Sequence, residues 1–269
     1  VADRAESLRV DHLVHVSREG NRGPYLVDLA KESGLVVTDM VDLQPWKKWA
    51  EKVSEVCCLI EVDSHCVLPR PVFGKSLDRP FKFRKATDDQ MRARVGRNWP
   101  TVREEVRRMP ESWTPPFDPV DVRLELSKDG GAELLSKCEI DPTVVAVTGV
   151  TGGSSYAIEH WENWCDSGIR SYHMKRNNAA LSDGVSRMSP WIHYGMISTT
   201  RMVRDASSIG GKGAEKFLDE MLVFREHAQH HVHAKDNPDD WANIPGWAIT
   251  SWNDRSPEVS ELSAVELER

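Results

Sequence analysis

The residue types best suited to chemistry gather in the second half of the chain. Tyr172 and Arg176 are four residues apart, so on a helix they would share one face. Ser186 and Ser189 follow a loop, and Pro190 stands where the first turn of a helix tolerates proline. Two hydroxyls beside the unpaired N–H groups of a helix start can bind a phosphate or another anion. An N-cap followed by a turn is the commoner explanation of an isolated S-x-x-S-P, so the longer context has to decide.

A second set of candidates lies on the longest expected helix, from about Ala214 to His233. Its apolar positions recur at helical spacing, and Glu220, Arg225 and Glu226 lie on the adjoining face. Charged residues on a helix are most often only solvated. Spacing alone therefore gives these three residues no role.

Four histidines crowd the end of that helix, and His227 and His231 are one turn apart. Such a pair could bind a metal, but no third ligand stands at a recognisable spacing and the sequence contains no H-E-x-x-H. Polar and cationic residues are favourable near a helix C-terminus on electrostatic grounds alone. We therefore expect no metal site.

Both segments resemble signature motifs of the photolyase/cryptochrome flavoproteins. The family turn T-S-x-L-S-P-Y-L-x-x-G corresponds to V-S-R-M-S-P-W-I-H-Y-G at residues 185–195. The family segment L-x-E-L-I-W-R-E is similar to L-D-E-M-L-V-F-R-E at residues 218–226. The resemblance covers the second half of the chain strongly and the first sixty residues weakly.

The resemblance implies a site for FAD. The cofactor-binding positions that it implies are Tyr172, Val185, Ser186, Arg187, Met188, Ser189, Phe217 and Arg225. Val185 stands where the family usually has threonine, so one hydroxyl contact is missing. The family's antenna domain also implies a second chromophore, a folate or a deazaflavin.

The same resemblance implies a contact surface for damaged DNA, formed by Arg176, Glu220 and Phe224. Glu220 would be the catalytic residue, hydrogen-bonding the pyrimidine dimer through water or as a protonated, buried acid whose pKa is raised. Phe224 takes the place of the family's tryptophan, which stacks beside the damaged bases.

The implied function is blue-light-driven repair of pyrimidine dimers in DNA by electron transfer from reduced FAD, a carbon–carbon lyase activity. A cryptochrome-like photoreceptor that binds flavin without repair is the alternative, and the departures at Val185 and Phe224 favour it somewhat. An inactive helical homologue is a third reading. We expect a monomer whose partner is DNA containing such dimers.

Family members continue with N-x-x-R-M and an Asp-rich segment that holds the flavin ring, and neither motif is found before Arg269. The opening strands of the family's antenna domain would similarly lie before Val1. We therefore expect this chain by itself to lack light-dependent repair.

The elements that must position these residues fall into three regions. The fold class expected is a partial parallel-sheet α/β domain of the antenna type (residues 1–68) followed by an all-α FAD-binding domain (residues 151–269). Residues 69–150 are expected to form a Pro-rich, basic linker between the domains.

The first region alternates between apolar strand patterns and helical ones. Leu13–Val16, Leu35–Asp39 and Cys57–Val62 are the expected strands. Helices are expected between them, around Tyr25–Ala30 and Trp46–Val53. Such alternation predicts a parallel sheet.

The middle region is broken by prolines and contains two helical patterns, Asp88–Val95 and Val102–Met109. Twelve Lys and Arg face five Asp and Glu between Arg70 and Arg108, which is typical of a solvated linker surface and less often of a nucleic-acid contact. The Gly-rich stretch Thr143–Ser155 matches no phosphate-binding fingerprint, so we interpret it as an extended linker before a helix.

Composition limits the remaining alternatives. The formal charge of −7 argues against a protein that holds nucleic acid with its whole surface. Five cysteines without a C-x-x-C indicate neither a disulfide framework nor a zinc site, so a reducing, intracellular location is expected. No apolar run approaches the ~20 residues of a membrane helix, and no membrane partner is expected.

Overall fold

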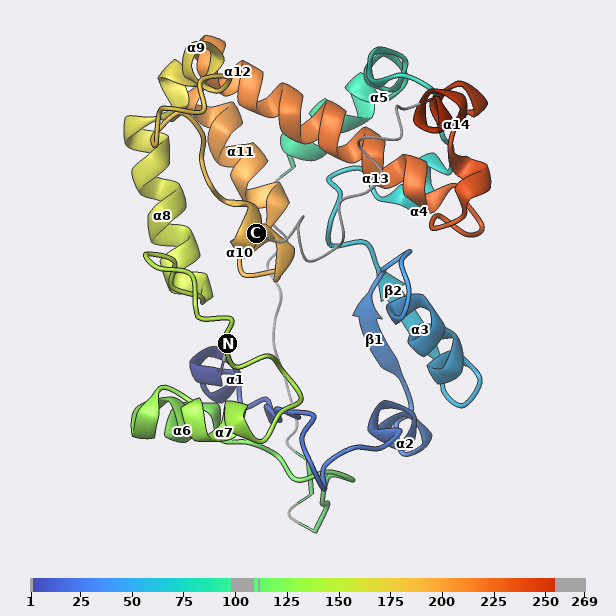
Figure 1. The fold of residues 1–269 in the computed structure, drawn as a ribbon, viewed down its shortest axis with the longest axis vertical. Coiled ribbons are helices and arrows are strands. Elements are labelled where there is room, and N and C mark those ends of the chain that lie inside the picture. Colours follow the sequence, from blue (N-terminus) through green and yellow to red (C-terminus); the bar gives the residue numbers. More distant parts are fainter. Residues whose placement is uncertain (1, 98–108, 111, 255–269) are drawn as a thin grey trace.

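The computed structural model describes residues 2–97, 109–110 and 112–254. Figure 1 shows one long helix, formed by α12, η2 and α13, across the upper part of the molecule. Helices α8 and α11 lie below one end of it, and a two-stranded sheet lies below the other end. The expected helix Val102–Met109 lies almost entirely outside the described residues, as does the chain after residue 254.

The sheet pairs β1 (Val36–Asp39) with β2 (Leu59–Val62) in parallel, with Val36 opposite Leu59. Helices α2 (Tyr25–Lys31) and α3 (Trp46–Ser54) connect and flank the strands. This unit confirms the expected βαβ alternation for the second and third strand patterns.

The first expected strand, Leu13–Val16, is wrong: no strand forms at these residues. The Val14 carbonyl accepts a hydrogen bond from the Val120 N–H, and the buried Asn21 side chain binds the Val16 and Asp118 carbonyls. This segment pairs with a loop about a hundred residues later, because its short apolar alternation does not specify which backbone becomes its partner.

The remaining elements are helical. They are α1 (Ala2–Ser7), α4 (Arg70–Phe73), α5 (Pro80–Val95), α6 (Val122–Asp129), α7 (Ala132–Ser136), α8 (Ser154–Ser167), η1 (Ile169–Ser171), α9 (Tyr172–Lys175), α10 (Ser189–His193), α11 (Thr199–Ile209), α12 (Gly211–Asp219), η2 (Glu220–Arg225), α13 (Glu226–His233), η3 (Trp241–Asn243) and α14 (Gly246–Asn253). Residues 154–254, all of which are described, contain no strand, as the three-to-four spacing predicted. Among the described residues, no helix combines the length and apolarity that crossing a bilayer requires.

The core lies between α8, α11 and α12. Trp161, Met202 and Phe217 are buried there at the apolar positions of their helices. Phe83 and Met91 of α5 belong to the same core, although the sequence analysis assigned them to the linker. Helix α5 therefore packs as part of the helical unit and extends the pattern expected from Asp88 to Val95 toward Pro80.

The long helix changes geometry in its middle. Residues 220–225 form the π-helix η2, in which hydrogen bonds join residues five apart instead of four. Single π turns inside α-helices occur frequently at functional sites. Three of the residues singled out in the sequence, Glu220, Phe224 and Arg225, lie on this turn.

Candidate functional site

A close backbone contact fixes α12 against η1 and α9. A Cβ atom at Gly213 would lie 2.0 Å from the Ile169 carbonyl oxygen and 2.5 Å from that of Arg170. Only glycine permits this approach. The contact places the residues of α9 beside the next two turns of the long helix.

An aromatic cluster fills the interface that Gly213 creates. The Phe217 ring lies 5.3 Å from the Trp161 ring, 5.3 Å from Trp164 and 5.8 Å from Tyr172, measured between centroids. Phe217 is only 4% exposed, so its ring is enclosed by its neighbours. Burial first, and then the charge of Glu220, raise the pKa of the Tyr172 hydroxyl above its usual value.

A chain of three charged groups leads from this cluster to an exposed aromatic ring. Glu220 Oε1 lies 2.8 Å from Lys216 Nζ and 3.5 Å from Arg176 Nε. Lys216 Nζ also lies 5.2 Å from the centroid of the Phe224 ring, which is 47% exposed. We call Tyr172, Arg176, Lys216, Glu220 and Phe224 the α9–η2 face.

The α9–η2 face therefore brings together the three residues that the sequence assigned to DNA. It also adds Lys216, which spacing alone had not singled out. The Glu220 side chain is 34% exposed and paired with two cations, so the expected buried acid is wrong for this residue. The aromatic surface of Phe224 remains open to a stacking partner.

The 185–189 turn lies at the start of α10, as expected, with Pro190 in the first helical turn. Met188 is buried, whereas Val185, Arg187 and Ser189 are exposed. Arg187 adopts a positive φ of 53°, and its Nε donates to the Ser182 carbonyl. The Ser186 carbonyl lies 2.9 Å from His160 Nε2. The turn thus presents hydroxyls and helix-start N–H groups on the surface.

Arg225 points to a different neighbour. Its Nη1 donates to the His65 carbonyl at 2.7 Å, and Thr199 Oγ1 donates to the same oxygen at 3.1 Å. No contact among the described residues joins Arg225 to the 185–189 turn. That Arg225 and this turn share one cavity stays a prediction.

Glu226 has a role that the sequence analysis did not assign. It is 1% exposed, and its two carboxylate oxygens accept the Val67 N–H at 2.6 Å and the Leu68 N–H at 3.2 Å. Burial raises the pKa of Glu226 to about 7, although the two N–H donors oppose the rise. His230 Nε2 lies 3.0 Å from the Leu68 carbonyl oxygen. Helix α13 therefore holds residues 65–70, which we call the 65–70 segment.

A buried ion-pair network holds the other side of the same segment. Arg70 Nε donates to Asp63 Oδ2 at 2.9 Å, Nη2 donates to the Met40 carbonyl at 2.7 Å, and Nη1 binds the Asp42 carboxylate. Burial raises the pKa of Asp63, but the hydrogen bonds and charge of Arg70 outweigh it and hold this pKa below its usual value. The network joins the carboxyl ends of β1 and β2 to the start of α4.

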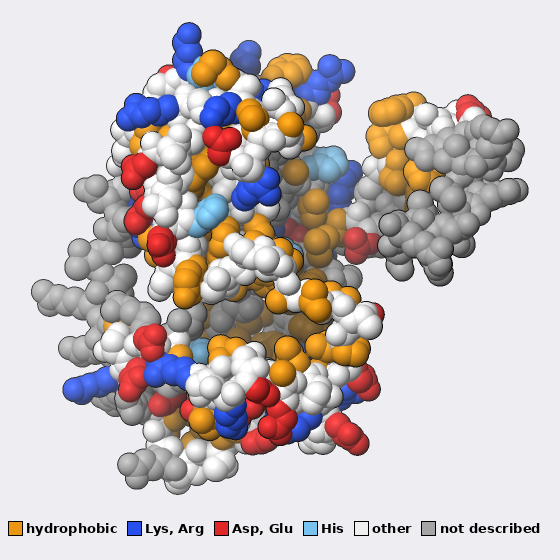
Figure 2. Space-filling model, turned by 60° about the vertical axis from the view of Figure 1, so that its left-hand side comes forward, with side chains coloured by type: hydrophobic (Ala, Val, Ile, Leu, Met, Phe, Trp, Pro, Cys, Tyr) orange, Lys and Arg blue, Asp and Glu red, His pale blue; other side chains and the backbone are white. Residues whose placement is uncertain are grey.

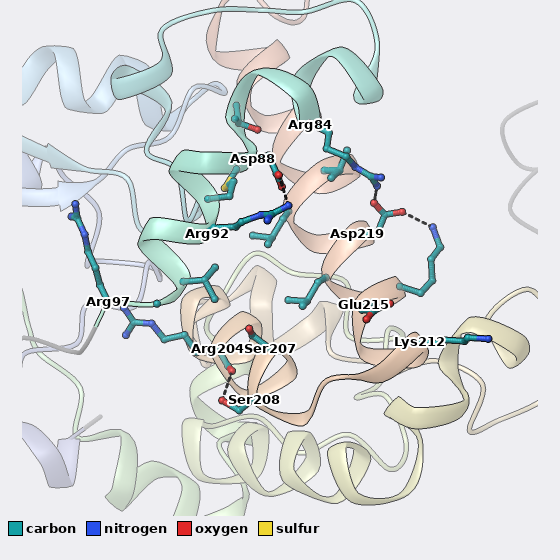
Figure 3. A pocket seen from close by; sticks show the side chains of 18 residues that line it. Arg84, Asp88, Arg92, Arg97, Arg204, Ser207, Ser208, Lys212, Glu215 and Asp219 are labelled. Atoms are coloured by element: carbon teal, nitrogen blue, oxygen red, sulfur yellow. Dashed lines mark hydrogen bonds and ion pairs between the residues drawn. The ribbon is translucent and has the colours of Figure 1, made fainter.

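An open cleft of about 1200 Å³ lies between α5, α11 and α12 (Figure 3). Its cations are Arg84, Arg92, Arg97, Arg204, Lys212 and Lys216, and its acids are Asp88, Glu215 and Asp219. Asp88 pairs with Arg92, and Asp219 pairs with Arg84 and Lys216. Lys216 belongs to both this cleft and the α9–η2 face, so the two are neighbours. Figure 2 shows further Lys and Arg side chains at the upper end of the molecule, where Figure 1 places α9 and α12.

No protein-family profile matches the chain. Curated relatives named deoxyribodipyrimidine photo-lyase match most of it. The one from Methanothermobacter thermautotrophicus is 23% identical over 251 residues, which are 90% of this chain and 52% of the relative. The one from Arabidopsis thaliana is 21% identical over 246 residues, which are 87% of this chain and 48% of the relative. The chain thus spans about half the length of the curated relatives it matches.

A solved structure of a Synechocystis cryptochrome has a similar fold. The TM-score is 0.53 at 13% sequence identity, and the match covers 78% of this chain and 44% of that one.

Proposed function

We propose that the chain is a flavin-binding member of the photolyase/cryptochrome family, as its similarity to curated photo-lyases indicates, and that it recognises pyrimidine dimers in DNA. The observation that carries the proposal is the α9–η2 face, where the exposed Phe224 ring lies beside Lys216, which pairs with Glu220, and Glu220 also pairs with Arg176. A flipped pyrimidine dimer offers the matching chemistry: planar rings, N–H and carbonyl groups, and flanking phosphates.

The 185–189 turn fits the phosphate end of FAD. Ser186 and Ser189 supply hydroxyls, and the start of α10 supplies N–H groups with a positive dipole end. Val185 supplies no hydroxyl, and Phe217 is closed in by three rings, so neither residue adds a polar contact. When bound, FAD would supply light-driven electron transfer to the dimer.

The chain's own residues would position the substrate. Phe224 would stack on one pyrimidine ring, and Glu220, held by Lys216 and Arg176, would accept a hydrogen bond from a base N–H. Arg97 and Lys212 of the neighbouring cleft pair with no described carboxylate, so both remain open to DNA phosphates. These contacts would recognise an extruded lesion and its backbone together.

Replacing Phe224 by alanine is expected to weaken binding of a dimer-containing oligonucleotide by roughly 5- to 150-fold, because stacking contributes about 1–3 kcal/mol per base. Fluorescence anisotropy measures the affinity. Phe81→Ala is the matched control, since Phe81 is 62% exposed and lies at the start of α5. Equal losses in both variants would place the lesion elsewhere.

The double variant Ser186→Ala/Ser189→Ala is expected to weaken FAD binding by at least about tenfold, because it removes both hydroxyl donors from the phosphate site. Quenching of flavin fluorescence reports the affinity, and Ser136→Ala on the remote helix α7 is the control. Unchanged FAD affinity in the double variant would contradict the assignment of the phosphates to the 185–189 turn.

Repair itself is tested by illuminating the flavin-loaded protein with a dimer-containing oligonucleotide under reducing conditions. Dimer loss above a dark control and above free flavin supports the lyase. Flavin binding without dimer loss is already expected of this chain by itself. The cryptochrome-like photoreceptor, which the departures at Val185 and Phe224 suit, is favoured if the anisotropy measurement also shows no preference for dimer-containing DNA.

A further inference from the structure

Three buried side chains that could ligate a metal converge where α13 meets the 65–70 segment. They are Cys66, Glu226 and His230, which are 5%, 1% and 2% exposed. One ligand atom from each lies within 4.8 Å of those of the other two. The sequence analysis considered only the pair His227 and His231 and expected no metal site; it did not consider Cys66, which lies about 160 residues before α13 along the chain.

The hydrogen bond of His230 fixes its tautomer. A carbonyl only accepts, so Nε2, which faces the Leu68 oxygen at 3.0 Å, carries the proton. Nδ1 then has a free lone pair, and this buried atom has no hydrogen-bond partner among the described residues. Metal-ligating histidines commonly donate their other N–H to a backbone carbonyl in this way.

The backbone of the 65–70 segment also orients Glu226. Each carboxylate oxygen accepts one N–H group of the 65–70 segment, which leaves further lone pairs free. Ligating carboxylates are typically hydrogen-bonded like this by an outer shell. Glu226 and His230 are four residues apart on α13, so both lie on one face of that helix.

The third group is a thiol. Cys66 Sγ makes no hydrogen bond to a described residue, and its backbone N–H donates to Asp63 Oδ1. Burial, and then the carboxylate charges of Glu226 and Asp63, raise the pKa of this thiol well above its ordinary value. Its proton is therefore retained unless a cation compensates for the charge of the thiolate.

We propose that Cys66, Glu226 and His230 form a buried site for a zinc-class divalent cation. Sulfur, imidazole nitrogen and carboxylate oxygen are the three ligand types of protein zinc. Binding displaces the Cys66 proton to solvent and forms the metal–sulfur bond. The thiolate and carboxylate together balance the charge of the ion.

The span of the cluster suits one ion. Zinc bonds are about 2.3 Å to sulfur and about 2.0 Å to nitrogen or oxygen, so side-chain shifts of roughly an ångström close the three groups on one ion. Phe73 and Phe83 pack their rings against His230 at 5.5 and 5.0 Å and keep that side apolar. A bound ion would join α13 to the 65–70 segment.

Cobalt(II) added to the metal-stripped 269-residue protein tests the site. We expect one equivalent to bind with a cobalt–thiolate charge-transfer absorption band, and zinc to displace it. Cys66→Ser is expected to abolish the band and to weaken cobalt binding by more than the roughly 10–100-fold that loss of an outer-shell partner costs. His230→Gln should weaken binding while a thiolate band persists at high cobalt concentration.

Two variants control for adventitious binding. Cys165→Ser removes a half-buried thiol on α8, and His231→Gln removes a neighbouring imidazole that hydrogen-bonds Ser76. Both should retain the band at full strength. The proposal is overturned if the unaltered protein shows no stoichiometric thiolate band, or if Cys165→Ser abolishes the band while Cys66→Ser keeps it.

Discussion

Replacing Arg70 by methionine should lower the free energy of unfolding by about 3–5 kcal/mol, the range found when one partner of a buried ion pair is removed. The Arg70 side chain is 2% exposed, and those of its partners Asp63 and Asp42 are 1% and 15% exposed. Without the guanidinium, two carboxylates would be left in a largely dry environment, and the Met40 carbonyl would lose its donor.

Urea unfolding measures this loss, with Arg201→Met as the matched control. Arg201 pairs with Glu162 on the surface, where the two side chains are 38% and 59% exposed. Such a pair contributes at most about 1 kcal/mol. Asp63→Asn introduced together with Arg70→Met should recover part of the stability, because it removes the stranded charge. Similar losses for Arg70→Met and Arg201→Met would contradict the buried network.

Replacing Gly213 by alanine is the second change with a large expected effect. The added methyl group would meet the Ile169 and Arg170 carbonyl oxygens at 2.0 and 2.5 Å, and backbone atoms cannot swing aside as a side chain can. Overpacking of this kind costs about 1–3 kcal/mol or more. We also expect α9 to move away from α12, which would break the Arg176–Glu220 pair and loosen the rings around Phe217.

Thermal unfolding and near-ultraviolet circular dichroism follow both effects, since the dichroism reports the packing of Trp161, Trp164 and Tyr172. Gly246→Ala is the control, because its Cβ would meet no described atom within 4 Å apart from its chain neighbours and the backbone of its own helix. Its effect should stay within about 0.5 kcal/mol, as for other surface substitutions. A Gly213→Ala protein with unchanged dichroism and oligonucleotide affinity would show that the helix approach does not position the α9–η2 face.

Local periodicity was enough to predict the regular elements. Val- and Ile-rich runs located β1 and β2, and three-to-four spacing located α8 and the long helix, because both signals are carried by consecutive residues. Leu13–Val16 shows the limit. Its apolar alternation resembles that of β1, yet its Val14 carbonyl accepts a hydrogen bond from the Val120 N–H and its Val16 carbonyl accepts one from the Asn21 side chain. The apolar alternation identifies neither partner.

The residues of the candidate site also fall into those that the sequence could predict and those that it could not. Arg176, Glu220 and Phe224 could be singled out because their motifs are contiguous and resemble those of a known family. Glu226 lies on the same helix and was given no role, since its partners Val67 and Leu68 are far away along the chain. Gly213 was overlooked for a related reason: its need for close contact becomes visible only when η1 is packed against α12.

The π turn at residues 220–225 has a consequence for insertions and deletions. Each residue rotates an α-helix by about 100°, and a turn closed by bonds five residues apart accommodates one residue more than a regular turn. Deleting one residue from this turn would therefore let a regular α-helix form, while the helices on either side kept their orientation relative to each other. Glu226 and His230 would still face the 65–70 segment, but Glu220 and Phe224 would lose the positions that the wider turn gives them. A one-residue deletion in the regular part of α12 or α13 would instead rotate everything downstream by about 100°, so we expect it to be tolerated less well than the same deletion in the π turn.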